Sequence, residues 1–303
     1  MSLFSGGLDS YISAVDVLSK GETPLFVSHY YASQTSSCQS LCSDHLTKKF
    51  PGSVMEFFRS RIGFDHTMIP AFAKDKGEKT ERSRSFLFFS LAALAASCLR
   101  KPVKILVPEN GLIALNVPLE RLRLGALSTR TTHPFFIARF NELVRTIGVQ
   151  AEYDNPYKFK TKGEMARDCA DPKFVEVTAK DTSSCSSPNK GRWKKISAGH
   201  CGFCMPCLIR RASMKAAFGK DSTDYGLELK GVLNSRQASG RHVRAFQIAF
   251  ERLHNSKNYA AAAVRIPGPL SDCEKDVPEL TDVYIRGMEE VEDLLKSVKT
   301  RPS

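Results

Sequence analysis

The sequence lacks long apolar runs and a leader segment. No stretch of its 303 residues approaches the ~20 apolar residues that a membrane-spanning helix requires. The first 30 residues contain no basic segment followed by an apolar one, as a secretory signal would. We therefore expect a cytoplasmic protein without membrane contact.

Extremes of composition are missing as well. Hydrophobic residues make up 42% of the chain and charged residues 25%, which is ordinary for a globular protein. These fractions exclude a disordered tail protein, a collagen-like repeat and a small disulfide-rich domain. The length allows one large domain or two of middling size.

Two common nucleotide-binding motifs are also absent, because the sequence has neither G-x-x-x-x-G-K-[ST] nor a G-x-G-x-x-G after a strand. Its start instead carries Ser-Gly-Gly-Leu-Asp-Ser at residues 5–10, followed by a helical pattern over residues 11–18. Glycines let the backbone approach a phosphate closely, and the start of a helix offers amide groups to an anion. Asp9 can hold Mg²⁺ bound to phosphate oxygens. We thus predict a phosphate loop, after a strand that is either unusually short or begins upstream of Met1.

Alternating segments predict an α/β fold. Apolar runs predict strands at residues 24–30, 54–58, 103–107 and 149–153, and helical spacing predicts helices at residues 38–50, 83–99 and 134–147. Such alternation is typical of a mainly parallel sheet. The helix at residues 83–99 is apolar nearly all round, so we expect it to be buried. Helical patterns dominate after Asp224, which predicts a C-terminal helical extension over residues 221–303 behind a domain over residues 1–220.

Basic residues are in excess, with a net charge of +12. Between Pro156 and Lys220 the sequence holds 14 Lys and Arg but 5 Asp and Glu, a local net charge of +9. A basic surface there would attract nucleic acid, a phosphorylated substrate or an acidic partner. A solvated basic face with no partner is the competing interpretation.

Nine cysteines are present, and four of them have metal-ligand spacing: Cys185, Cys201, Cys204 and Cys207. Four thiolates satisfy tetrahedral Zn²⁺ and leave no open position for water, so we predict a structural zinc loop over residues 181–212. A [4Fe–4S] cluster is the main competitor, and His200 is an alternative ligand. Nearby cations would offset the thiolate charge: Lys194, Lys195, Arg210 and Arg211.

The loop at residues 5–10 resembles the PP-loop of the N-type ATP pyrophosphatases. This resemblance implies a Rossmann-like (HUP) parallel sheet and cleavage of ATP to AMP and pyrophosphate while a substrate is adenylated. The residues that would bind ATP are Ser5, Gly6, Gly7, Leu8, Asp9 and Ser10.

The pattern Cys-x₁₅-Cys-Gly-x-Cys-x-x-Cys, followed by Arg210, resembles the zinc signature of the 7-cyano-7-deazaguanine synthase (QueC) family. The segment at residues 83–93 is similar to that family's nucleotide-contact helix, with Arg84 at the matching position. Phe-Lys-Thr-Lys-Gly-Glu at residues 159–164 matches its Lys-x-Glu segment through Lys162 and Glu164. The resemblance covers roughly residues 4–215 and implies that Lys162, with Asp9, acts on the acyl-adenylate.

Two segments depart from the synthase, whose substrate-reading Asp-Cys-Arg is missing here. Pro-Glu-Asn-Gly at residues 108–111 and Ser-Thr-Arg-Thr-Thr-His-Pro at residues 128–134 look most like the QueC-like proteins of antiphage operons, such as the QatC and CBASS-associated proteins. Glu109, Asn110 and His133 are then candidate substrate residues. A turn and a helix cap are the plainer interpretation of the same residues.

These resemblances imply an ATP-dependent ligase with ATP, Mg²⁺ and Zn²⁺ as cofactors. It would activate a 7-carboxy-7-deazaguanine-type carboxylate for attack by an amine, which a partner protein in a defence complex could supply. Three alternatives stay open: an ordinary 7-cyano-7-deazaguanine synthase of queuosine biosynthesis, a tRNA-modifying PP-loop enzyme, and a non-catalytic scaffold. A homodimer is also open.

Overall fold

Five strands form one parallel sheet in the order β3-β2-β1-β4-β5. The strands are β1 (Ser2–Leu3), β2 (Leu25–His29), β3 (Glu56–Ser60), β4 (Val103–Leu106) and β5 (Ala151–Asp154). The computed structural model describes the whole chain except residues 31–32, 63–83, 121–130, 187–198 and 303. The predicted α/β fold with a parallel sheet is therefore confirmed, and β1 spans only two residues of the given sequence.

Helices cover both faces of this sheet. One face carries α1 (Leu8–Ser19) and α2 (Ser33–Lys49), and the other carries α3 (Arg84–Cys98) and α5 (Pro134–Thr146). Consecutive strand residues face opposite layers: Phe26 of β2 packs with α1, whereas Val27 packs with α3. The sheet is thus buried on both sides, as parallel sheets require.

The prediction that the apolar helix at residues 83–99 is buried holds for one of its sides and is wrong for the other. Phe89 and Leu91 of α3 are buried against the sheet, but Phe86 is 49% and Leu94 59% exposed. The helix forms the outer layer of the described structure, so its far side stays at the surface although it is apolar.

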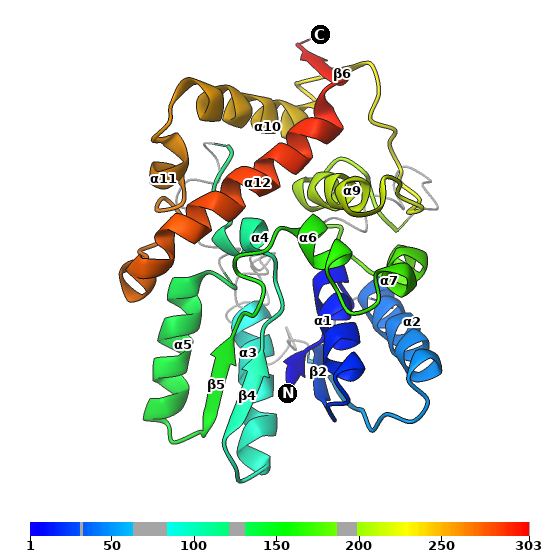
Figure 1. Cartoon of the computed structure of the whole chain (residues 1–303), viewed down its shortest axis with the longest axis vertical. Coiled ribbons are helices and arrows are strands. Elements are labelled where there is room, and N and C mark those ends of the chain that lie inside the picture. The colour runs from blue at the N-terminus through cyan, green and yellow to red at the C-terminus, as the bar shows by residue number, and fades with distance from the viewer. Residues whose placement is uncertain (31–32, 63–83, 121–130, 187–198, 303) are drawn as a thin grey trace, which may run out of the picture.

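The C-terminal residues form a second helical layer at one end of the molecule (Figure 1). Its elements are α10 (Ala238–Asn255), α11 (Tyr259–Ala263), α12 (Val277–Leu295), the 3₁₀ helix η4 (Ser271–Asp276) and a small parallel pair of β6 (Val232–Asn234) with β7 (Lys299–Arg301). Their apolar side chains share one core with α4 (Gly111–Leu115) and α9 (Met205–Phe218). Helices dominate this part of the chain, and they pack on residues of the first 220. No described helix has the length and apolar character of a membrane span.

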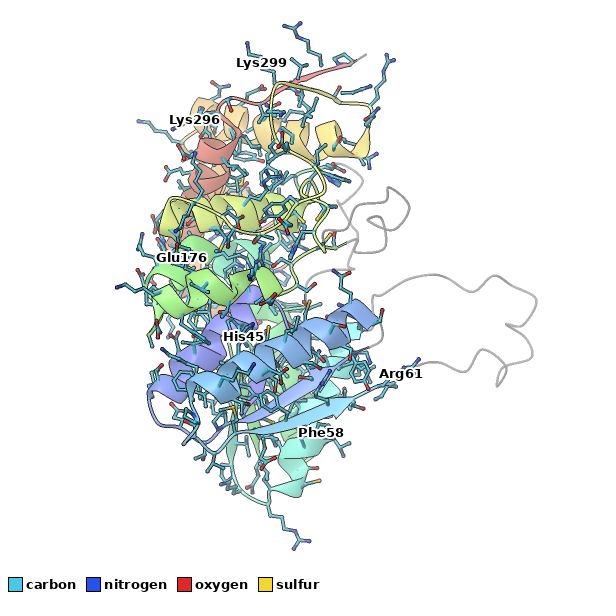
Figure 2. All side chains as sticks on the ribbon, turned by 90° about the vertical axis from the view of Figure 1, so that its right-hand side faces the viewer. His45, Phe58, Arg61, Glu176, Lys296 and Lys299 are labelled. Atoms are coloured by element: carbon cyan, nitrogen blue, oxygen red, sulfur yellow. The ribbon has the colours of Figure 1, made fainter. Side chains whose placement is uncertain are left out.

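Three short elements connect the sheet to this layer: α6 (Lys162–Arg167), α7 (Pro172–Thr178) and the 3₁₀ helix η3 (Ala179–Asp181). In the side view of Figure 2, Phe58 on β3 lies toward one end of the molecule, while Lys296 and Lys299 lie at the other. The carboxyl ends of the sheet strands point toward the helical layer, with α4 and α6 between them (Figure 1). From β1 the chain adds β2 and β3 on one side of the sheet and then β4 and β5 on the other side. Open parallel sheets bind ligands at such a switch point, which lies here between β1 and β4.

Candidate functional site

The loop after β1 is held on two sides. Gly6 has a φ of +78°, and its carbonyl accepts a hydrogen bond from Ser183 N at 2.8 Å. A Cβ on Gly6 would lie 3.0 Å from the Gln39 side chain, whose amide donates to His29 O at 3.1 Å. Only glycine suits this backbone and this space. Gly7 is the N-cap of α1. Because glycine has no side chain, it does not cap the first-turn amides of the helix.

A cleft of about 290 Å³ opens beside this loop, at the carboxyl ends of β1, β2 and β4. Its polar wall includes Ser5, Ser10, His29, Thr35, Arg84, Glu109, Thr131 and Thr132, and its apolar wall includes Phe88 and Phe89. The hydroxyl oxygens of Ser5 and Ser10 lie 3.2 Å apart. Leu8 is buried in the core, so it can offer a ligand its backbone but not its side chain.

Asp9 and Lys162 form a buried ion pair next to the cleft. Lys162 Nζ contacts Asp9 Oδ1, while Asn110 donates to Asp9 Oδ2 from its side chain at 2.7 Å and from its backbone at 3.0 Å. Burial opposes ionisation of Asp9, but the ammonium of Lys162 and these hydrogen bonds prevail and lower its pKa to about 2. Both carboxylate oxygens therefore already accept protein donors, and a Mg²⁺ ion at Asp9 would have to share them with Lys162 and Asn110.

Lys162 is the first residue of α6, and the start of this helix places its side chain within reach of Asp9. Thr161 caps the helix by accepting from Glu164 N at 3.0 Å, and Glu164 returns a bond by accepting from Thr161 N at 2.9 Å. This capping box fixes the first turn of α6 and thus the starting point of the Lys162 side chain.

Glu109 adds a second carboxyl to the pair. Its side chain hydrogen-bonds to Asp9 and accepts from Asn110 Nδ2 at 3.1 Å. Burial and the neighbouring Asp9 carboxylate raise the pKa of Glu109 well above its ordinary value. The Asn155 side chain holds the backbone of Glu109 by donating a hydrogen bond to Glu109 O at 2.7 Å. The site thus combines an ionised carboxylate and an ammonium with a second carboxyl whose ionisation is disfavoured.

Glu109→Gln is expected to stabilise the protein at pH 7 and to change its stability little at pH 4. Because the pKa of Glu109 is raised on folding, its stabilising contribution is complete below the unfolded pKa near 4.3 and falls as the pH rises, by up to about 1.4 kcal/mol per pH unit. Glutamine mimics the protonated carboxyl and does not titrate. Urea unfolding at both pH values measures the difference, and equal effects at the two would show that Glu109 ionises normally.

Asn110 and His133 are both helix caps. Asn110 Oδ1 accepts from Ile113 N at 3.1 Å to cap α4, in addition to its bonds with Asp9. His133 is buried, caps α5 by accepting from Phe135 N at 3.2 Å, and packs under Gly268. Among the described residues, the cleft is lined by the neighbours of His133 and not by His133 itself.

Sequence reasoning missed three residues that shape this site. His29 ends β2 and lines the cleft, Gln39 supports the phosphate loop from α2, and Asn155 follows β5. The one available signal was position, since His29 and Asn155 stand at the carboxyl ends of predicted strands. Lys194, Lys195 and residues 128–130 lie outside the described residues.

The four predicted cysteines come together. Their sulfur atoms all lie within 4.8 Å of one another, with 3.9 Å between Cys185 and Cys204 and 3.9 Å between Cys201 and Cys207. The sulfur atoms of a zinc tetrathiolate are about 3.8 Å apart at the usual Zn–S length, so the group could hold a single ion such as zinc. A [4Fe–4S] cluster attaches each thiolate to a different iron and needs a wider cage. His200 is not in the group and accepts from Ser184 N at 3.2 Å.

The cysteine group is joined to the phosphate loop. Arg210, which is fully buried on α9, donates to Thr182 Oγ1 at 2.7 Å and to Ala179 O at 2.6 Å. The segment that it holds contains both Ser183, which bonds to the phosphate loop, and Cys185. One short segment therefore serves both sites.

In the described part of the basic stretch at residues 156–220, most of the Lys and Arg side chains form ion pairs with carboxylates. Of its 14 Lys and Arg residues, those between residues 187 and 198 lie outside the described part. Six others form ion pairs: Lys158, Lys160, Lys162, Arg167, Lys215 and Lys220. Asp276 and Asp293 of the C-terminal layer supply two of the partners. The local excess of +9 is thus partly cancelled by carboxylates from elsewhere in the chain.

Comparison with known proteins adds no relative. No protein-family model matches the chain, and a search of curated proteins finds no match. The geometry of the site therefore carries the functional argument.

Proposed function

We propose that the protein is an ATP-dependent, AMP-forming ligase with a Rossmann-like (HUP) fold. The observation that carries this proposal is the glycine loop at the start of α1, which opens into a cleft beside the buried Asp9–Lys162 pair. The strand order supports it, because doubly wound sheets of this order bind nucleotides where the order reverses. The type of reaction, cleavage of ATP to AMP and pyrophosphate, is proposed from the resemblance to the PP-loop enzymes.

The reaction makes a carboxylate reactive. A carboxylate repels nucleophiles, and adenylation replaces its charge with a phosphate leaving group. The first-turn amides of α1 and the hydroxyls of Ser5 and Ser10 would bind the phosphates, and Arg84, which also lines the cleft, would contact the nucleotide. Lys162 would neutralise charge that develops on the acyl-adenylate. Mg²⁺, when bound, supplies further neutralisation of the phosphates, with Asp9 as its candidate ligand.

The raised pKa of Glu109 would suit an anionic substrate. A second ionised carboxyl beside Asp9 would repel a substrate carboxylate, whereas a protonated Glu109 can donate a hydrogen bond to it. Phe88, which is half-buried and lines the cleft, offers an apolar surface for a flat ring. On the family resemblance, we propose a 7-carboxy-7-deazaguanine-type acid as this substrate, and an amine of a partner protein or ammonia as the acceptor.

Product analysis tests the proposal. Purified protein with ATP, Mg²⁺ and 7-carboxy-7-deazaguanine is expected to release AMP and pyrophosphate, and Asp9→Ala protein is expected to release neither. ADP and phosphate would contradict the PP-loop assignment. In the presence of an operon partner, an increase of the partner's intact mass by one deazaguanine amide would identify a protein acceptor, whereas free nitrile without a partner would identify an ordinary synthase.

The alternatives predict different outcomes. A tRNA-modifying enzyme would need a basic surface for phosphates, but six of the cations that suggested one are committed to ion pairs. A scaffold would turn over no ATP with any of these substrates.

A further inference from the structure

Helix α12 contacts both elements that supply Asp9 with hydrogen-bond donors. Figure 1 shows it crossing the molecule above α4 and α6. Asn110 is the N-cap of α4, and Lys162 is the first residue of α6. The C-terminal layer therefore lies directly behind the Asp9 network.

The contact with α6 is made by charged side chains. Glu290 accepts a hydrogen bond from Thr161 Oγ1, and Arg286 forms an ion pair with Glu164. Arg286 also donates to Phe159 O at 3.0 Å. Thr161 and Glu164 are the two members of the capping box, so α12 holds the residues on either side of Lys162.

The packing at these contacts leaves no room for a side chain. A Cβ on Gly163 would lie 2.4 Å from Glu290 Oε1, and a Cβ on Gly111 would lie 2.7 Å from Val283 Cγ1. Such approaches require glycine. The fit therefore fixes α6 and α4 against α12 at their first turns.

Lys162 needs such support. A helix of six residues does not hold its shape in water by itself, and burying a lysine side chain restricts its many rotamers. The anchor is a helix of 19 residues whose other face is buried in the core shared with α4 and α9. A rigid long helix can thus fix a short one.

We infer that Glu290 and Arg286 are positioning residues that hold Lys162 against Asp9, so that α12 forms the rear wall of the site. The catalytic consequence rests on the proposed function, but the placement of Lys162 does not. The C-terminal layer then completes the site.

Chemical labelling tests the placement without any assay of activity. The full-length protein and its Glu290→Ala/Arg286→Ala variant are methylated with formaldehyde and borohydride, and each lysine is quantified by peptide mass spectrometry. We expect Lys162 to be protected in the parent protein and its labelling to rise at least about fivefold in the variant. Lys296, 71% exposed and at the far end of the molecule (Figure 2), is the internal standard.

Two controls separate positioning from general loosening. Glu289→Ala removes an exposed carboxylate from the same helix and should leave Lys162 protected. Lys49, paired with Asp171 on a different part of the fold, reports global unfolding. Unchanged labelling of Lys162, or a rise of Lys49 together with Lys162, would overturn the inference. If the double variant fails to fold, Glu290→Gln keeps the shape but loses one acceptor, and a smaller rise at Lys162 is then required.

Activity adds a second criterion. If the protein turns over ATP, the double variant should lose kcat with little change in the KM for ATP, and Glu290→Gln should recover part of kcat. Increased labelling of Lys162 in a protein without ATP turnover would refute the proposed function and leave the positioning role intact.

Discussion

Cys204→Ser protein is expected to be recovered either insoluble or without metal, and where it is soluble it should bind ATP more weakly than the parent protein. Four thiolates 3.9 to 4.8 Å apart leave no alternative ligand set among the described residues once one is lost. Metal binding at structural zinc sites contributes on the order of 10 kcal/mol or more to folding. Elemental analysis should give one zinc per parent chain and none in the variant.

The weaker ATP binding follows from the segment that the two sites share. Cys185 belongs to the metal group, and Ser183, two residues earlier, holds the carbonyl of Gly6. Releasing Cys185 frees this segment from one of its anchors, and Arg210 remains as the other. Chelation of the parent protein should therefore weaken ATP binding in calorimetry even where the protein stays folded.

The matched control is Cys98→Ser, because Cys98 is an exposed thiol at the end of α3. This variant should keep its metal, its solubility and its affinity for ATP. Metal retained at full occupancy in Cys204→Ser would refute the four-cysteine site. Absorption bands of an iron–sulfur cluster in the parent protein would instead support the competing cofactor.

The parts of the site that the sequence predicted are those whose residues lie close together in the chain. The glycine loop and the three cysteines from Cys201 to Cys207 each lie within a few residues, so their spacing reports their geometry directly. Asp9 and Lys162 were found separately, each from its own motif, but nothing in either motif indicated that they form an ion pair.

The parts that the sequence did not predict depend on tertiary packing. Gln39 supports the phosphate loop from another helix, and Glu290 meets Thr161 across 129 positions of the chain. The net charge of residues 156–220 was misleading for the same reason. Lys158 and Lys215 form ion pairs with carboxylates of the C-terminal layer, and the charge of the stretch alone does not include them. Periodicity likewise could not say that one apolar side of α3 stays at the surface.

Lys162→Met is expected to lower the free energy of unfolding by about 3–5 kcal/mol at pH 7, because it leaves the buried Asp9 carboxylate without its counter-charge. In the parent protein the pKa of Asp9 is lowered to about 2, so the pair stabilises the fold above the ordinary pKa near 3.9, and that stability is lost as the pH falls toward 2. In the variant, burial without the ammonium raises the pKa of Asp9. The deficit should therefore shrink as the pH is lowered from 7 to 4.

A double-mutant cycle measured by urea unfolding isolates the pair. Asp9→Asn/Lys162→Met removes both buried charges and should recover most of the stability that either single variant loses, although none of the three should release AMP. Lys160→Met, two residues away, removes an exposed lysine that lies 3.5 Å from Asp168, and it should cost less than about 1 kcal/mol. Additive losses in the cycle would mean that Asp9 and Lys162 do not depend on each other, and the site would then need a different account of what keeps Asp9 ionised.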